Sequence, residues 1–304
     1  MIFKQYELGC LSLFSYLVGD EASGRAVVVD PQRDVSEYVA DAKRLGLRIE
    51  RVIETHFHAD FLSGHLELAA HTGAAIVYGA AAAGRAEFPI ETVADGNRIH
   101  LGRDGRGVEL EIRETPGHTP ESISIVIFPD GATSEPYGVL TGDTLFIGDV
   151  GRPDLLASVG VTADELARQL FHSLHTKLLT LPDATKVYPA HGAGSACGKN
   201  LSSETVSTIG EQRRTNYALA PMSEAEFVEA VTQGQSVAPL YFAFAANSTS
   251  AVRGLPAGDA LARTSEAVSA LAHVGHGAAP SQAPRPARFA LSAHQYARRA
   301  TVCP

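Results

Sequence analysis

Thr55-His56-Phe57-His58-Ala59-Asp60-Phe61 is the stretch of sequence that decides the fold. In it a single residue separates two histidines, and a carboxylate follows two residues after the second. Imidazole and carboxylate groups are common metal ligands. The residues just before it, 47–53, alternate apolar with polar and end in Val52-Ile53, which predicts a β-strand that leads into a turn. A strand end holds ligands rigidly, so the stretch predicts a metal-binding turn. The alternative is a pair of surface histidines beside a helix-capping aspartate.

The composition is typical of a soluble globular protein. The 304 residues, 45% hydrophobic and 19% charged, suffice for one or two domains with a sizeable core. A net charge of -9 argues against a nucleic-acid partner, and the short apolar segments predict no membrane span. Residues 1–6 lack the pattern of a secretory signal. Cys10, Cys197 and Cys303 are odd in number and far apart, which argues against a disulfide framework and predicts a cytoplasmic location.

Strand-like and helix-like segments alternate in the first part of the chain, and from residue 108 the pattern turns to β-strands, followed by a long helix and a short strand. The order suits an α/β protein in which two packed sheets carry helices on their outer faces, an αββα sandwich. We expect this domain to occupy residues 1–249. Residues 250–304 are rich in Ala, Pro, Ser and Arg, and predict a low-complexity, disordered tail with a helix at most over 259–272. The expected strands are 25–30, 47–53, 74–78, 108–113, 122–128, 137–140 and 186–188, and the expected helices are 35–45, 61–71 and 162–179.

Three further segments place metal-ligand side chains just after a predicted strand. They are Thr115–Pro120, which contains His118, Leu140–Thr144, which contains Asp143, and Pro189–Gly192, which contains His191. Any one of these side chains alone is more often a packed, surface or turn-forming residue than a metal ligand. Four strand ends with similar turn chemistry in one chain predict a single metal site.

These four segments, in this order and over roughly residues 10–200, resemble the metallo-β-lactamase superfamily, whose fold is the αββα sandwich. Two-metal hydrolases of the superfamily, such as glyoxalase II, carry a histidine at the position of Phe61. A phenyl ring offers no lone pair, so a second metal on Asp60 and His191, bridged by Asp143, would be weakly held. We therefore expect one metal per chain, with Phe61 disfavouring hydrolysis by blocking a second.

The resemblance is to the persulfide dioxygenase branch, and it implies iron ligands at His56, His118 and Asp143. It also implies that His58, Asp60 and His191 surround these ligands and orient them or bind water. Two imidazoles and a carboxylate with open positions suit non-haem iron(II). Zinc with a bound water is the alternative for the same side chains.

Two more functional residues follow from the same resemblance. Residues 148–154, 191–199 and 210–216 are similar to persulfide dioxygenases that are often fused to a rhodanese sulfurtransferase domain. Arg152 would pair with a substrate carboxylate, or else tie down its own loop. Cys197 would lie close to the iron, or else be inert packing. With Asp60 and His191, they complete the expected catalytic group. The chain after residue 250 is too short for a rhodanese domain.

The resemblance implies an iron(II)-dependent dioxygenase that oxidises a low-molecular-weight thiol persulfide, such as glutathione persulfide, with O2 to sulfite and the thiol. One rival is a zinc-dependent hydrolase of a thioester or lactone. Another is a non-catalytic sulfur carrier that works through Cys197. The sequence leaves open a separate sulfurtransferase partner, a homo-oligomer and the identity of the thiol.

Overall fold

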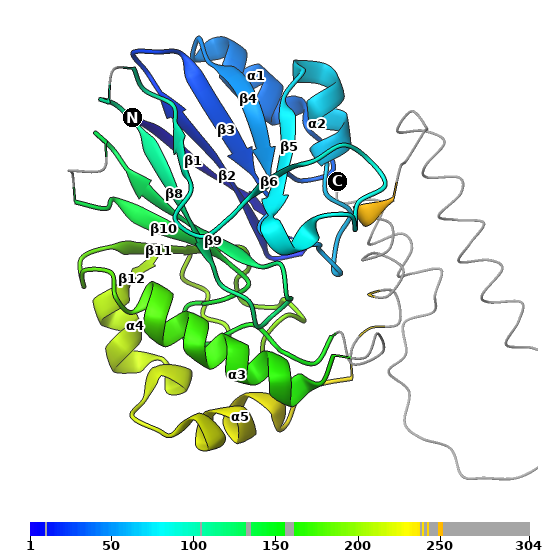
Figure 1. The fold of residues 1–304 in the computed structure, drawn as a ribbon, viewed down its shortest axis with the longest axis vertical. Helices are drawn as coiled ribbons and strands as arrows, with labels where there is room; N and C mark the ends of the chain where they lie inside the picture. Colours follow the sequence, from blue (N-terminus) through cyan, green and yellow to red (C-terminus); the bar gives the residue numbers. More distant parts are fainter. Residues whose placement is uncertain are drawn as a thin grey trace, which may run out of the picture. The chain divides into compact units, whose positions relative to one another are not determined.

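The computed structural model describes residues 1–9, 11–103, 105–131, 135–155, 161–237, 239, 242 and 249–251. Met1–Ala251 form one compact unit. Two sheets pack face to face and helices cover both outer faces, as Figure 1 shows, so the predicted αββα sandwich is confirmed. The predicted domain boundary after residue 249 stays a prediction. Residues 252–304 of the expected C-terminal tail, with its helix, lie outside the described residues.

The N-terminal sheet has its described strands in the order of the sequence. Strands β1 to β3 pair antiparallel, and β3 to β6 pair parallel. Parallel neighbours need a crossover connection. Two of these crossovers are helices that cover the outer face of the sheet, α1 (Ser36–Arg44) and α2 (His65–Thr72). The strands are β1 (Ile2–Leu8), β2 (Leu13–Asp20), β3 (Arg25–Val29), β4 (Arg48–Ile53), β5 (Ala75–Gly79) and β6 (Glu91–Val93).

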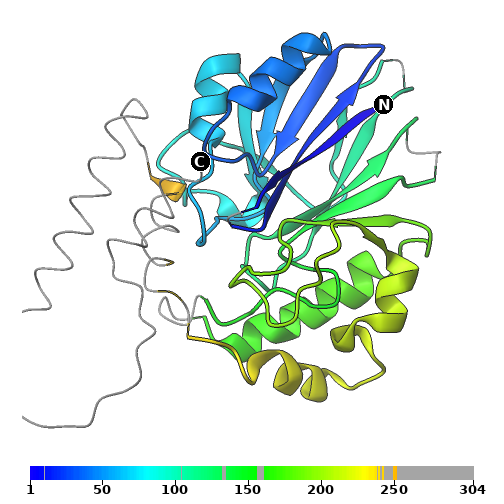
Figure 2. The same ribbon diagram turned by 180° about the vertical axis from the view of Figure 1, so that it is seen from behind.

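The second sheet runs in the order β12-β11-β10-β9-β8-β7 and is antiparallel except between β10 and β11. Helices α3 (Ala163–Ser173), α4 (Ile209–Thr215) and α5 (Glu224–Thr232) lie together over its outer face, which Figure 2 shows from behind. The strands are β7 (Arg98–His100), β8 (Glu109–Glu114), β9 (Ile123–Phe128), β10 (Gly138–Gly142), β11 (Lys186–Pro189) and β12 (Ser207–Thr208).

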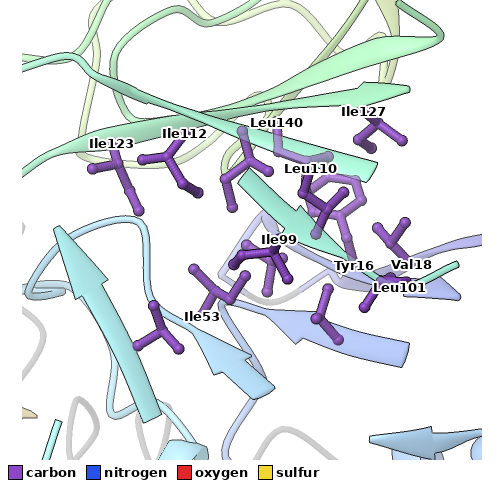
Figure 3. Close-up of a cluster of buried hydrophobic side chains, with 14 of the residues drawn as sticks. Tyr16, Val18, Ile53, Ile99, Leu101, Leu110, Ile112, Ile123, Ile127 and Leu140 are labelled. Carbon is purple, nitrogen blue, oxygen red and sulfur yellow. The ribbon is translucent and has the colours of Figure 1, made fainter. Parts of the chain in front are cut away.

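Strand β9 shows how the layers are held together. All of its residues are buried, because side chains alternate between the two faces of a strand and both faces are covered here. Ile123, Ile125 and Ile127 enter the core between the two sheets, which Figure 3 shows in close-up. Val126 and Phe128 enter the core beneath the helices. Packing on both faces therefore holds the second sheet in place.

The structure corrects one predicted boundary. The helix expected to begin at Phe61 begins at His65. Ser63 donates a hydrogen bond from its hydroxyl to the Glu54 carboxylate, and the Gly64 backbone N–H donates to the Pro31 carbonyl. These bonds to residues just after β3 and β4 hold residues 61–64 in a turn. The predicted helix over 162–179 is present as α3 and a following π-helical turn, Leu174–Leu178.

The strands end together at one edge of the sandwich. The Ile123 N–H donates to the Thr55 carbonyl across the two sheets, and the Ala190 N–H donates to the Gly142 carbonyl. The first bond places the turn after β4 beside the start of β9, and the second joins the end of β10 to the turn after β11. Within the part of the chain that the structure describes, no helix is both long and apolar enough to cross a bilayer.

Candidate metal centre

Three buried side chains from three different turns converge on one point. They are His56 after β4, His118 between β8 and β9, and Asp143 directly after β10, and their ligand atoms lie within 4.8 Å of one another. Asp143 Oδ2 lies 3.4 Å from His118 Nε2 and 3.9 Å from His56 Nε2. Ligands about 2.1 Å from a tetrahedral metal ion lie roughly 3.4 Å apart. The cluster therefore has the dimensions of a metal site.

Hydrogen bonds hold both imidazoles with Nε2 toward this point. His118 Nδ1 lies 2.9 Å from the Arg152 carbonyl, which only accepts, so Nδ1 carries the proton and Nε2 presents a lone pair. His56 Nδ1 lies 3.0 Å from the Thr55 hydroxyl oxygen. Burial, followed by the neighbouring histidines His58 and His118, holds the pKa of His56 well below its usual value. A neutral imidazole is the form that binds a metal ion.

The polar atoms at the centre of the cluster fit a cation. Among the described residues, His56 Nε2 and both carboxylate oxygens of Asp143 are buried without a hydrogen-bond partner. A buried polar atom left unpaired costs about 1–3 kcal/mol, and a charged group costs more. A metal ion between His56, His118 and Asp143 would satisfy all of these atoms.

His58 lies beside this cluster in a network of buried acids. Its Nε2 is 3.0 Å from Asp30 Oδ1 and 3.3 Å from Glu54 Oε2, and its ring centroid is 4.2 Å from that of His56. Burial alone would lower the pKa of His58, but Asp30 and Glu54 raise it well above its usual value. Burial in turn raises the pKa of Glu54 to about 7, partly offset by His58. His58 is thus positioned by two carboxylates outside the three-residue cluster.

Sequence reasoning missed Asp30 and Glu54. Asp30 accepts hydrogen bonds from the Thr55 N–H at 2.7 Å and the Thr55 hydroxyl at 2.8 Å, in addition to its contact with His58. It therefore connects the end of β3 to the turn that carries both histidines. A signal was present, because Asp30 is the last residue of a predicted buried strand, and Asp143 lies just past the end of another. Its partner at residue 55 was not visible in the sequence.

A second group forms next to the first. His191 Nε2 lies 3.1 Å from Asp60 Oδ2 and 3.6 Å from Asp143 Oδ1. Burial opposes the charged form of His191, but Asp143 and Asp60 raise its pKa above the usual value. Burial would raise the pKa of Asp60, and His191 lowers it. The two side chains therefore form a buried ion pair that touches the first cluster through Asp143.

Cys197 completes this second group. Asp60, His191 and Cys197 have one ligand atom each within 4.8 Å of one another. The thiol is buried and is not in a disulfide. Burial, and then the Asp60 and Asp143 carboxylates, raise the pKa of Cys197 well above its usual value. The thiol is therefore protonated at neutral pH, and it lies close to Asp60 and His191. A position close to a bound iron stays a prediction.

Phe61 packs against His58. The two ring centroids are 4.4 Å apart and Phe61 is buried. On the other side, the Phe146 ring centroid lies 6.2 Å from that of His191. The two phenyl rings form an apolar wall around the charged groups.

The Arg152 guanidinium donates hydrogen bonds to acceptors of the protein itself. Nε and Nη2 donate to the Asp154 carboxylate at 2.7 and 2.8 Å, Nη2 also donates to the Ser236 carbonyl, and Nη1 donates to the Ala196 carbonyl. The side chain is 1% exposed. This geometry favours the loop-tying alternative. A role in binding a substrate carboxylate stays a prediction, and it would require Asp154 to be displaced.

Comparison with known proteins agrees with this geometry. Residues 8–191 match the Metallo-beta-lactamase superfamily, and the chain belongs to that superfamily. It is 34% identical over 218 residues to the human protein named Persulfide dioxygenase ETHE1, mitochondrial, covering 71% of this chain and 74% of that protein. It is 32% identical over 189 residues to the cytoplasmic hydroxyacylglutathione hydrolase of Arabidopsis thaliana, covering 62% and 67%.

Two crystal structures are similar over most of the chain. A metallo-beta-lactamase from Staphylococcus aureus superposes with a TM-score of 0.76 and 36% identity, covering 84% of this chain and 74% of the other. ETHE1 from Myxococcus xanthus superposes with a TM-score of 0.67 and 30% identity, covering 82% of this chain and 99% of the other. Both are consistent with the sandwich seen here.

Proposed function

We propose that this protein is an iron(II)-dependent persulfide dioxygenase, which oxidises a low-molecular-weight thiol persulfide such as glutathione persulfide. The observation that carries the proposal is the buried cluster of His56, His118 and Asp143, with an apolar ring at position 61 beside it. The similarity to a human persulfide dioxygenase over most of both chains supports it. The reaction converts the persulfide, O2 and water into the thiol, sulfite and two protons.

The proposed ligands are the two Nε2 atoms and the Asp143 carboxylate. Two imidazoles and one carboxylate leave coordination positions open, which is the arrangement that iron(II) oxygenases use. Bound there, iron(II) would supply adjacent positions for oxygen and the persulfide sulfur, so that proximity replaces a bimolecular encounter. The Arg152 carbonyl fixes the ring of His118, and Thr55 fixes that of His56.

The neighbouring groups have proposed roles in binding and proton transfer. His191, whose pKa is raised by Asp143 and Asp60, holds a proton at neutral pH and can donate it to a leaving thiolate. The Phe61 and Phe146 rings exclude water from this side of the centre. Cys197 lies beside Asp60 and His191. Arg152 holds the loop before Cys197 by donating a hydrogen bond to the Ala196 carbonyl.

The test is oxygen uptake by anaerobically purified, iron-loaded protein on addition of glutathione persulfide, with sulfite measured in parallel. We expect uptake with matching sulfite, lost in His118→Ala together with bound iron. His71→Ala is the matched control, because His71 is an exposed histidine at the end of α2 and its removal leaves the cluster intact. Absence of uptake from a fully iron-loaded sample would contradict the proposal.

The second candidate is a zinc-dependent thioester hydrolase. It is favoured by the close approach of His191 to both Asp60 and Asp143 and by the similarity to a hydroxyacylglutathione hydrolase. A zinc ion held by these side chains would supply an activated water for attack on the thioester carbonyl. Zinc-loaded protein that hydrolyses a hydroxyacylglutathione without oxygen, and iron-loaded protein that takes up none, would identify this activity.

A further inference from the structure

A buried carboxylate joins the two turns that carry His56 and His118. Glu121 accepts a hydrogen bond on Oε1 from the Phe57 backbone N–H at 3.1 Å, and its side chain is 1% exposed. Phe57 lies between the two histidines of the first turn, and Glu121 lies three residues after His118 in the second. One side chain therefore connects the segment of one proposed ligand to the segment of another.

A second hydrogen bond joins the same two segments. The Ile123 N–H donates to the Thr55 carbonyl at 2.9 Å, two residues along the chain from the bond between Glu121 and Phe57. The Thr55 carbonyl and the Phe57 N–H belong to the two peptide groups on either side of His56. Both of these peptide groups are therefore held to residues at or just before the start of β9.

Arg85 holds the buried carboxylate in place. Its Nη1 donates to Glu121 Oε2, so that each carboxylate oxygen has a donor. An opposite charge offsets part of the cost of burying a carboxylate. The Arg85 guanidinium also lies 4.9 Å from the centroid of the Phe57 ring, which is within the range of a cation–π contact. On the same ring, Tyr78 stacks at 4.6 Å between centroids. The backbone and the ring of Phe57 are thus both held by this group of residues.

Close backbone packing fixes Glu121 itself. A Cβ at Gly79, the last residue of β5, would lie 2.5 Å from the Glu121 carbonyl oxygen and 2.8 Å from Ile123 Cγ2. Contacts this short are not tolerated, so only glycine at residue 79 allows residues 121–123 to lie against β5. The Glu121 backbone therefore has a rigid mount on the N-terminal sheet, and this mount does not depend on a bound metal.

We propose that Glu121 is a positioning residue of the metal centre, which sets the distance between His56 and His118, and that Arg85 supports it. The inference rests on the proposed ligand set and not on the oxygenase reaction. Neither side chain belongs to the cluster of proposed ligands, so both act through the backbone of Phe57. Without the bond to Glu121, the turn of His56 keeps only one of its two bonds to the start of β9, and the spacing of the ligands is no longer fixed.

The test uses Co²⁺ as the probe, because its visible absorption bands report the number and geometry of its ligands. The metal-free full chain is titrated, and loss of the bands in His118→Ala assigns them to the cluster. Glu121→Met fills similar space without an acceptor for the Phe57 N–H. It should shift the bands and weaken Co²⁺ binding about 10–100-fold, the loss typical of indirect partners of a metal. Glu121→Gln keeps an acceptor and should restore the parent's bands and affinity.

Glu109→Met is the matched control. Glu109 is also a buried glutamate, and its carboxylate is paired with Arg98 and His100. It begins the six-residue strand β8, whose other end leads to His118, so about 17 Å of strand separates it from the centre. Glu109→Met should lower the urea midpoint but leave the bands and the affinity unchanged. A merely structural role of Glu121 would give the same result as this control.

Failure of the inference and failure of the proposed function give different results. If Glu121→Met binds Co²⁺ with the parent's affinity and bands, the inference is wrong and the metal centre stands. A parent that binds no Co²⁺ would overturn both. Bound Co²⁺ in the parent, together with no oxygen uptake after iron loading, would contradict the dioxygenase alone.

Arg85→Met replaces Glu121→Met if circular dichroism shows that the latter has not folded. The Arg85 side chain is 42% exposed, so its replacement leaves the core intact. It should shift the Co²⁺ bands in the same direction with a smaller loss of affinity, because Glu121 loses its support but keeps its bond to Phe57. Parental bands and affinity in a folded Arg85→Met protein would overturn the proposal.

Discussion

Replacement of Asp30 by asparagine tests how the turn that carries His56 and His58 is held. The Asp30 carboxylate accepts hydrogen bonds from the Thr55 N–H, the Thr55 hydroxyl and His58 Nε2, at 2.7, 2.8 and 3.0 Å. It is 1% exposed, so no solvent replaces these bonds. Asparagine has nearly the same shape and tolerates the positive φ of 49° at this position. Asp30→Asn therefore removes a charge while leaving the backbone unchanged.

The expected loss follows from the three hydrogen bonds. Bonds to a charged group contribute about 1.5–3 kcal/mol and neutral ones about 0.5–1.5 kcal/mol, so three conversions cost roughly 3 kcal/mol. The substitution also frees the Thr55 hydroxyl. With the amide donating to its oxygen, the hydroxyl can donate to His56 Nδ1, which moves the imidazole proton to Nε2. An Nε2 that carries a proton cannot bind a metal ion, and we expect iron affinity to fall about 10–100-fold.

Urea unfolding of the metal-free protein, followed by circular dichroism because the chain lacks tryptophan, measures the first effect. Iron titration measures the second. Asp183→Asn is the matched control, because Asp183 forms an exposed ion pair with Arg213 and its loss should cost at most about 1 kcal/mol. If Asp30→Asn destabilises the protein no more than Asp183→Asn does, or binds iron as tightly as the parent, the assigned role of Asp30 is wrong.

Three further predictions concern the loop, the metal and pH. Asp149 accepts hydrogen bonds from the backbone N–H groups of Lys199 and Asn200, so Asp149→Ala should speed labelling of Cys197 by a thiol reagent about 10–100-fold. A metal ion present at 100 times its dissociation constant adds about 2.7 kcal/mol, so chelation should lower the melting temperature by roughly 5–10 °C. Hydrogen bonds from Lys4 and Arg44 lower the pKa of Asp41 to about 2. The resulting stabilisation is complete above pH about 4 and is lost as the pH falls through 2. Asp41→Asn should therefore have a free energy of unfolding about 1 kcal/mol lower than that of the parent at pH 6. Between pH 4 and 2 the variant should lose less stability than the parent does.

Each of these has a direct check. Labelling is measured with Cys10 and Cys303 replaced by serine, and equal rates in the two proteins would show that Asp149 does not hold the loop. The chelation effect should vanish in His118→Ala, and a melting temperature indifferent to chelator in the parent would contradict a bound metal. Urea midpoints at several pH values test the role of Asp41. If the midpoints of parent and Asp41→Asn change with pH in parallel, Asp41 does not contribute the stabilisation assigned to it.

The sequence by itself determined the sandwich, and it placed the candidate metal ligands at strand ends. Alternating apolar residues and Gly- or Pro-containing turns act within a few neighbours, so they are visible without the fold. This local information placed His56, His118 and Asp143 just after strands, and the structure brings all three together. Strands β1, β2, β6, β7 and β12 were not among the expected strands. The last three have only two or three residues, and so short a segment shows no periodicity.

Only the tertiary structure decided which side chains pair. Asp30 reaches Thr55 and His58 from a strand that lies 25 and 28 residues earlier. Cys197 meets Asp60 from the opposite end of the domain's sequence. Arg152 is bound by Asp154 and by backbone carbonyls, which a sequence motif cannot distinguish from an arginine open to a substrate. Such pairs depend on how separate turns pack against each other, because a residue's own sequence neighbourhood sets its element and its face but not its distant partner.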